Sequence, residues 1–209
     1  MRRTIVSVML ACVALTAAAE DDSVYSTHWV QFQPVQVKGE VQGCQLTFLT
    51  VTADRAYLNG NQVAVNGSIL LRLTNNALGL MLKVGLKDIT SGSAFERPAF
   101  AYLQTATAST AKAQQQSVDG DPGYKLFIYR ATDSDTRQVL EELMASRKAS
   151  IGYNRKTDGI DVLVPLDLTV IDSQYTEDLK VKRSRSLDIV RAFAACAVKI
   201  LSVVLDQRK

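Results

Sequence analysis

The chain has 209 residues, of which 47% are hydrophobic and 22% are charged, and its formal net charge at pH 7 is +3. This composition excludes disorder over the whole length and provides enough apolar residues for one buried core of ordinary size. A charge so close to neutral gives no electrostatic reason to expect nucleic acid as a partner.

The first 19 residues have the layout of a secretory signal peptide. Arg2 and Arg3 precede an apolar run from Ile5 to Leu15, and three alanines lead from this run to an acidic stretch. The run is much shorter than the roughly 20 residues that a membrane-spanning helix needs. We therefore expect cleavage after position 19. The mature domain is then 20–209, with a formal charge of +1 and no transmembrane segment.

The same segment fits two other export routes less well. Met9 to Cys12 loosely resembles the box before a lipid-modified cysteine, but the apolar stretch continues beyond Cys12, where such proteins usually turn polar. The paired arginines fit the core of a twin-arginine signal, although almost nothing precedes them. General export is the favoured route.

Residues 68–89 predict a β-hairpin. Leucine, isoleucine and valine alternate with smaller or polar residues on both sides of Asn75-Asn76, a period of two that is typical of strands with one buried face. Asparagines tolerate positive φ in a tight turn. The turn sets the expected register, in which Leu73 faces Leu78, Leu71 faces Leu80 and Ile69 faces Leu82.

Further strands are expected along the rest of the chain, separated by turns. Their ranges are 28–37, 44–52, 100–103, 124–129, 149–154 and 161–171. The expected turns are Asn59-Gly60, Asn66-Gly67 and Thr157-Asp158-Gly159. Pro165 cannot donate a backbone hydrogen bond, so it belongs at a sheet edge or a bulge.

Two stretches predict helices. Residues 132–135 have the spacing of a capping box, and apolar residues follow at helical spacing up to Met144, with Arg147 and Lys148 expected in the last turn. A second helix is expected from about Leu187 to Leu205. Its apolar stripe comprises Leu187, Val190, Ala194, Ala197, Leu201 and Val204. The fold class that follows is one α+β domain of mainly antiparallel sheet, a sandwich or open barrel, with one internal helix and the C-terminal helix packed on the sheet.

A long polar segment, residues 105–123, interrupts the strands. A connection of this length in a compact domain usually indicates a functional or mobile loop. It is an exposed, flexible excursion, a binding loop or an extended edge hairpin. The side chains that a binding loop would use are Gln114, Gln115, Gln116, Asp119 and Asp121.

Cys44 and Cys196 are the only cysteines left once the signal peptide is removed. Because exported proteins meet oxidising conditions, an even pair is more often a disulfide than two reactive thiols. The bridge fastens the last helix to an early strand, and Phe193, Ala197 and Ile200 are then expected to contact the core. The alternative is two buried free thiols.

The sequence contains no motif for catalysis or for a cofactor. The single histidine, His28, has no nucleophile-elbow motif or sequence partner and is expected to be structural or at the surface. No CxxC or HxxxH spacing supports zinc, and the acidic pairs around 120 and 134 do not continue into a calcium-binding loop. We expect no metal and no cofactor.

Asp161 and Asp167 lie on the face of their expected strand opposite the valine and leucine row. Solvated side chains are the simpler interpretation, and a carboxylate pair for hydrolysis is the alternative.

Four cations, Lys180, Lys182, Arg183 and Arg185, precede the last helix. They form a solvated, mobile connector, or they contact an anionic partner or membrane surface.

The segment Leu140–Val170, which contains KASIGYNRKTDGI and VLVPLDLTV, is similar to the closing part of the invasion-associated locus B family of exported bacterial proteins. The overlap contains no catalytic residue, so the resemblance assigns no site. The arrangement of tryptophan and cysteine expected in the early part of that family is missing.

We therefore expect an exported bacterial envelope protein, periplasmic or secreted, that binds a macromolecular partner and is not an enzyme. The partner is expected to be another envelope or secreted protein. Two alternatives stay open. One is a hydrolase that acts on envelope material through Asp161 and Asp167, and the other is a periplasmic carrier whose leucine and valine rows enclose a small ligand.

Overall fold

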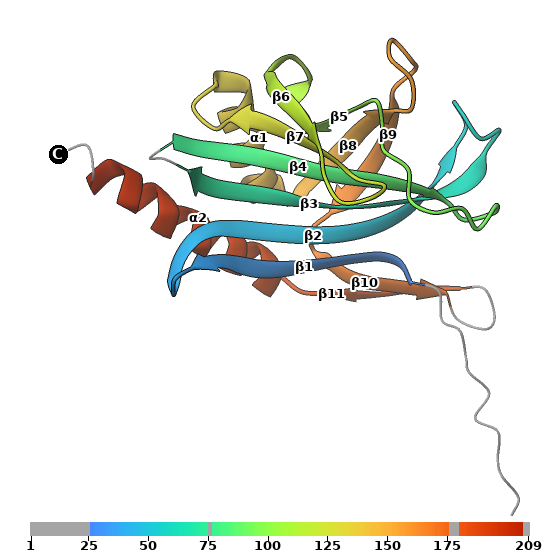
Figure 1. Ribbon diagram of the computed structural model, residues 1–209. Coiled ribbons are helices and arrows are strands. Elements are labelled where there is room, and N and C mark those ends of the chain that lie inside the picture. The colour runs from blue at the N-terminus through green and yellow to red at the C-terminus, as the bar shows by residue number, and fades with distance from the viewer. Residues whose placement is uncertain (1–25, 75–76, 176–179, 207–209) are drawn as a thin grey trace, which may run out of the picture.

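The structure of the protein is a computed structural model that describes residues 26–74, 77–175 and 180–206. Eleven strands, two α-helices and a short 3₁₀-helix lie within these residues (Figure 1). The strands are β1 (Ser26–Val37), β2 (Glu40–Asp54), β3 (Asn61–Thr74), β4 (Ala77–Asp88), β5 (Phe100–Gln104), β6 (Gln114–Asp119), β7 (Lys125–Arg130), β8 (Lys148–Asn154), β9 (Val162–Asp167), β10 (Val170–Tyr175) and β11 (Val181–Arg185). The helices are η1 (Thr110–Lys112), α1 (Ser134–Ser146) and α2 (Asp188–Asp206). The expected signal peptide lies outside the described residues.

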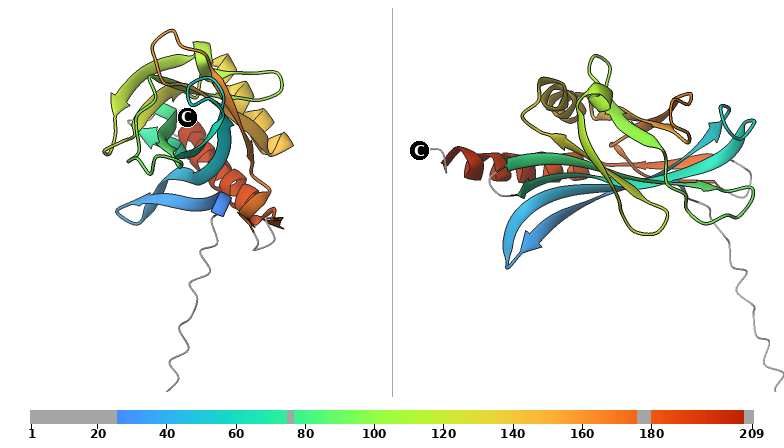
Figure 2. Two further views of the ribbon diagram at one scale, coloured as in Figure 1. Left: turned by 90° about the vertical axis from the view of Figure 1, so that its right-hand side faces the viewer. Right: turned by 45° about the horizontal axis from the view of Figure 1, so that its top comes forward.

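The strands form two antiparallel sheets. The larger sheet has the order β11-β10-β1-β2-β3-β4-β7-β6, and the smaller one has the order β5-β8-β9. Helix α2 lies against β1, β2 and β3 of the larger sheet, while α1 contacts β8 of the smaller one (Figures 1 and 2). The predicted fold class is confirmed, because the chain is mainly antiparallel sheet with one internal and one C-terminal helix.

Side chains from both sheets and both helices share one hydrophobic core. Alternate residues of the larger sheet point inward, and Leu46 and Leu82, for example, have no exposed surface. Ile151 of the smaller sheet is equally buried. The leucine and valine rows that predicted the strands are therefore the rows that fill the core.

The β3–β4 hairpin has the predicted register. Its pairs include Leu73 with Leu78, Leu71 with Leu80 and Ile69 with Leu82. The turn residues themselves, 75–76, lie outside the described part of the chain. The apolar alternation was enough to place both strands, because a shift of one residue would turn every buried side chain toward water.

The predicted turn at Asn66-Gly67 is wrong, because both residues lie inside β3. A Cβ atom on Gly67 would come within 1.9 Å of the backbone oxygen of Lys83 on β4. Glycine is needed here because the two backbones approach closely. Glycine has this role inside strands, in addition to its role in turns. The expected turn at Asn59-Gly60 is present, with φ angles of 53° and 90°.

The single strand expected at 161–171 is two strands in different sheets. Strand β9 ends at Asp167 in the smaller sheet, and β10 begins at Val170 in the larger one. At the corner between them, Leu168 donates its backbone N–H to the carbonyl of Arg147 at 2.9 Å. Pro165 sits on β9, an edge strand of the smaller sheet, as predicted.

Helix α1 begins and ends slightly differently from the prediction. Its N-cap residue is Asp133 rather than Thr132, and the helix ends at Ser146. Arg147 is the C-cap in the left-handed conformation, with φ 62°, and Lys148 already belongs to β8. The two cations therefore follow the last turn instead of lying in it.

Helix α2 is joined to β2 by a disulfide between Cys196 and Cys44. Phe193, Ala197 and Ile200 are buried in the core, as expected from that bridge. The buried face of α2 is rotated slightly from the predicted stripe, because Leu201 is 41% exposed while Cys196 is buried. Within the described residues, no helix is long and apolar enough to cross a bilayer.

A buried polar cluster joins the two sheets where β2 ends. The carboxylate of Asp54 accepts hydrogen bonds from the hydroxyl of Tyr153 at 2.9 Å and from Nε of Arg155 at 3.3 Å. It also accepts from the backbone N–H groups of Ala56 at 3.1 Å and Tyr57 at 2.9 Å. Asp54 has no exposed surface, and a buried carboxylate is tolerated only with partners of this kind.

Candidate functional site

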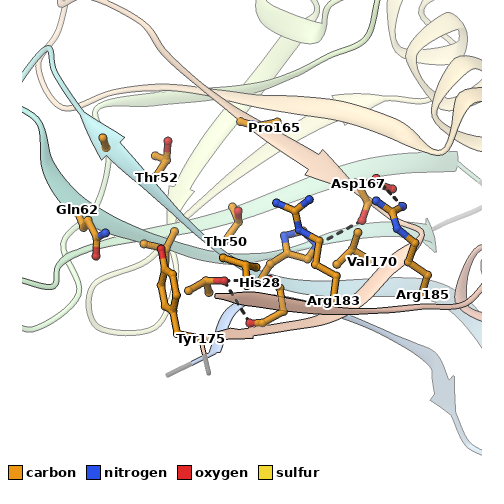
Figure 3. A pocket seen from close by; sticks show the side chains of 15 residues that line it. His28, Thr50, Thr52, Gln62, Pro165, Asp167, Val170, Tyr175, Arg183 and Arg185 are labelled. Carbon is orange, nitrogen blue, oxygen red and sulfur yellow. Dashed lines mark hydrogen bonds and ion pairs between the residues drawn. The ribbon is translucent and has the colours of Figure 1, made fainter. Parts of the chain in front are cut away.

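A pocket of about 420 Å³ opens where β1, β2, β9, β10 and β11 meet (Figure 3). We call it the arginine pocket. The residues that define it in the argument below are Thr27, His28, Thr50, Thr52, Asp167, Arg183 and Arg185. It is formed at the corner between β9 and β10, where the chain passes from one sheet to the other, so residues distant in sequence converge there.

Because side chains alternate between the two faces of β11, only some of its cations reach this pocket. Val181, Arg183 and Arg185 line it, whereas Lys182 is not among the lining residues. Successive side chains of a strand point to opposite faces, so Lys182 is directed away. The whole strand is exposed and pairs only with β10 among the described strands, at the edge of the larger sheet.

His28 lies inside the pocket with its ring against the smaller sheet. Its Nε2 atom is 3.3 Å from the backbone oxygen of Asp167, so that nitrogen carries the proton and donates it. Burial lowers the pKa of His28 below 6.5, and the nearby Arg183 acts in the same direction. The backbone carbonyls of Asp167 and Val170 oppose this shift without reversing it. The imidazole is therefore neutral at pH 7 and acts as a hydrogen-bond donor.

Asp167 is held charged by its neighbours at the end of β9. Its Oδ1 atom accepts hydrogen bonds from the backbone N–H of Thr169 at 3.0 Å and from the Thr169 hydroxyl at 2.6 Å. Its Oδ2 atom forms an ion pair with Arg185 at 3.2 Å. Burial alone would raise the pKa of Asp167, but these hydrogen bonds and the Arg185 charge lower it overall.

Arg183 gives the arginine pocket its net positive charge. The Asp167–Arg185 ion pair is internally neutral, and no ion pair or hydrogen bond joins the Arg183 guanidinium to another residue of the described chain. Figure 3 shows its side chain extending toward His28. A guanidinium presents its donors as a planar fork that fits a carboxylate or a phosphate. The arrangement therefore offers one open cationic fork beside neutral donors.

The predicted cationic run is thus divided by the fold. Arg183 and Arg185 reach the arginine pocket, Lys182 faces away, and Lys180 lies just before β11. Residues 181–185 form a paired strand rather than a connector, although their side chains are exposed, as the interpretation of a solvated run expected. Residues 176–179 lie outside the described part of the chain.

The polar segment 105–123 is built as η1 followed by the edge strand β6, which pairs with β7. Gln116 and Asp119 are exposed, and Asp119 pairs with Arg97 at 2.7 Å. Asp121 pairs with Lys83 on β4. The side chains of Gln114 and Gln115 lie outside what the structure describes. Of the three interpretations, the extended edge hairpin matches this geometry, and the hairpin does not line the arginine pocket.

Asp161 and Asp167 do not form a pair. Asp161 accepts hydrogen bonds from the hydroxyl of Tyr102 at 2.8 Å and from the amide of Asn154 at 2.9 Å. Six positions of extended chain separate the two aspartates, which corresponds to about 20 Å. Carboxylate pairs that hydrolyse glycosidic bonds lie roughly 5 to 10 Å apart. This geometry gives no support to the hydrolase alternative.

Sequence reasoning missed the threonines of the arginine pocket. Thr50 lies on the same face of β2 as Leu46 and Phe48, and it is 5% exposed. A polar residue that continues the spacing of a buried apolar row is a signal in the sequence for a site at that position, because a buried polar group needs a partner. The pairing of His28 with Thr50 across β1 and β2 was not readable, because it depends on the register of two separate strands.

No group of three metal-ligating side chains comes together within the described ranges. No protein-family model, curated protein or solved structure matches the chain. The similarity of residues 140–170 to the invasion-associated locus B family therefore gains no support from these comparisons. The Cys44–Cys196 disulfide fits a location outside the cytoplasm.

Proposed function

We propose that this protein is an exported bacterial binding protein that holds an envelope or secreted protein by seating an anionic side chain of that partner in the arginine pocket. The observation that carries the proposal is Arg183, a cation directed into a pocket and left without an ion pair in the described chain. A carboxylate or phosphate seated there receives two parallel hydrogen bonds from the guanidinium.

The remaining lining suits recognition of an anion. The hydroxyl of Thr50 and the amide of Gln62 line the same pocket as neutral donors, whereas the Thr27 hydroxyl already donates to the backbone oxygen of Ser173. Asp167 does not repel an incoming anion strongly, because Arg185 and Thr169 already engage its two oxygens. His28 donates to a backbone carbonyl rather than to a nucleophile, so its geometry favours binding over acid–base chemistry.

The anion-binding step is tested by NMR of the only histidine. Tripolyphosphate and citrate serve as probes, and saturable shifts of the His28 ring signals are expected for the mature wild-type protein. Arg183→Gln should weaken probe binding at least about tenfold, because a charge-assisted hydrogen bond is lost. Lys182→Gln removes the same charge from the opposite face of β11 and should leave binding unchanged.

Equal binding by wild type and Arg183→Gln would contradict the anion site. The partner is tested separately by cross-linking in a bacterial envelope extract. A protein captured by wild type and Lys182→Gln but lost with Arg183→Gln supports the proposal. Failure to capture a specific protein, with probe binding intact, would leave the anion site standing and overturn the macromolecular role.

A further inference from the structure

Strand β11 forms one edge of the larger sheet (Figure 1). One side of the strand pairs with β10, and no other strand of the described chain pairs with its second side. All five residues of β11 are exposed. An exposed edge strand presents a row of unpaired backbone N–H and C=O groups, on which a segment of another protein can form a further strand.

We propose that the partner is bound through an extended acidic segment, which adds to the open edge of β11 as an antiparallel strand and places a carboxylate opposite Arg183. This inference rests on the function proposed above, because the carboxylate enters the same arginine pocket. It adds the chemistry of the partner. The bound segment carries an acidic residue and, two positions later, an apolar one.

The backbone groups of the two arginines of β11 face its open edge. Ser186, directly after the strand, donates its backbone N–H to the backbone oxygen of Thr169 at 3.0 Å, on the β10 side. Backbone groups of successive residues alternate between the two edges of a strand, so those of Arg185 and Arg183 point away from β10. The alternation continues to Val181, because the irregularity in this pairing lies on β10 and not on β11. An added strand therefore forms hydrogen bonds with the backbone of both arginines.

The side chains on one face of β11 determine what the added strand carries. Val181, Arg183 and Arg185 line the arginine pocket. Residues directly opposite each other in an antiparallel pair have Cβ atoms about 5 Å apart, so a carboxylate opposite Arg183 reaches its guanidinium. Arg185 already pairs with Asp167, and the position opposite it needs no charge. Val181 is 44% exposed, and an apolar side chain opposite it removes this surface from water.

The charge of β11 favours an acidic segment over a second copy of this chain. Antiparallel pairing of two β11 strands would bring the cations Lys182, Arg183 and Arg185 of one copy beside those of the other. Like charges across a strand pair are destabilising. The opposite edge of the larger sheet, β6, has the sequence QQQSVD and carries no cation. Within the larger sheet, β11 is therefore the edge that suits an acidic strand.

N-methylated peptides test the strand geometry directly. A chain that comprises residues 20–209 is titrated with a seven-residue threonine peptide that has glutamate at its fourth and valine at its sixth position, with both ends blocked. Saturable binding is expected. Hydrogen exchange of the Arg183 and Arg185 amides should become slower, whereas the amides of Lys182 and Ser184, which face β10, should keep their rates.

Methylation of the glutamate nitrogen removes a hydrogen bond to β11 and places a methyl group against the strand. It should weaken binding at least about tenfold. Methylation of the following threonine nitrogen is the matched control. That nitrogen faces away from β11, so binding should change less than about threefold.

Two protein variants test the charge. Arg183→Gln should weaken binding of the peptide at least about fivefold, because the ion pair with the glutamate is lost. Lys182→Gln should leave binding unchanged, since the Lys182 side chain points to the opposite face. Thermal melting of each variant shows whether it is folded.

The outcomes separate this inference from the function on which it rests. Equal binding of the two methylated peptides would overturn strand addition, and so would a failure of the parent peptide to bind while tripolyphosphate still binds. Peptide binding with slowed exchange at Arg183 and Arg185, in a protein that does not bind tripolyphosphate, would support strand addition and contradict the anion site alone.

Discussion

Tyr153 and Asp54 are joined by a hydrogen bond of 2.9 Å between side chains 99 positions apart in the chain. Tyr153 belongs to the smaller sheet and Asp54 ends β2 of the larger one, and both are fully buried. Burial raises the pKa of Tyr153, and the neighbouring Asp54 carboxylate adds to this shift, so the phenol stays protonated as a donor. The contact fixes how the two sheets sit together at one end of the core.

Tyr153→Phe should lower the free energy of unfolding by about 1–3 kcal/mol, because a buried carboxylate loses one of its donors. Urea denaturation of a chain that comprises residues 20–209 measures the change. Tyr57→Phe is the matched control, since the Tyr57 hydroxyl donates to the backbone oxygen of Ile160 in an exposed position. Its cost should stay below about 1 kcal/mol. Equal losses of unfolding free energy for the two variants would show that the buried hydrogen bond stabilises the protein no more than the exposed one.

Gly67→Ala should be one of the most damaging single-methyl additions in the molecule. The new Cβ atom would come within 1.9 Å of the backbone oxygen of Lys83, and a backbone in the middle of a sheet cannot move aside easily. We expect a loss of about 3 kcal/mol in unfolding free energy. Gly79→Ala, on β4, meets no atom closer than 3.7 Å and should be nearly neutral. Similar stabilities for the two variants would contradict this account.

These two glycines illustrate what the sequence could and could not predict. The alternation of leucines placed β3 and β4 correctly, because burial of one face leaves a single register. Asn66-Gly67 looked like a turn because the dipeptide is favoured there. Its role inside β3 depends on the approach of β4, a tertiary contact with no local signature.

The candidate site was only partly predictable for the same reason. The cationic run was visible in the sequence, and strand alternation explains why Arg183 and Arg185 face one side. That His28 and Thr50 lie on that side depends on the corner at Leu168, where one apparent strand passes between two sheets. The five apolar residues at alternate positions from 162 to 170 are all buried. The apolar period of two therefore continues through the corner, and the sequence shows no break there.

His28 should titrate below 6.5 in an NMR pH titration. Burial lowers this pKa most, Arg183 lowers it further, and the Asp167 side chain and the backbone carbonyls at 167 and 170 oppose the shift. Arg183→Gln should raise the pKa because a repelling charge is removed. Binding of tripolyphosphate to the wild-type protein should also raise it, since an anion favours the imidazolium. A pKa at or above 6.5 in the free protein would contradict the buried, neutral state.

The same shift predicts how stability depends on pH. The folded protein binds the His28 proton less tightly than the unfolded chain does. The stabilising contribution is therefore complete above about pH 6.5 and is lost as the pH falls through the lower folded-state pKa. His28→Gln should show a weaker loss of unfolding free energy than wild type between about pH 6.5 and 5. Parallel pH profiles for the two proteins would disprove the linkage.

Breaking the disulfide should destabilise the protein, with a ceiling of about 5 kcal/mol from chain entropy. The double variant Cys44→Ser and Cys196→Ser should unfold at lower urea concentration than the oxidised protein. Hydrogen exchange should increase most in α2, which loses its covalent attachment to β2. Mass analysis of residues 20–209 without reductant provides the control, because two alkylatable thiols would show that the bridge does not form.

Cys44 and Cys196 also enclose every strand from β3 to β11 within a single covalent ring. A protease that cuts an exposed connection inside this ring, such as the hairpin between β6 and β7, produces two polypeptides that remain one molecule. The severed ends stay paired in the same sheet, and α2 cannot diffuse away from β2. One such cut therefore changes the connectivity of the chain without releasing a fragment.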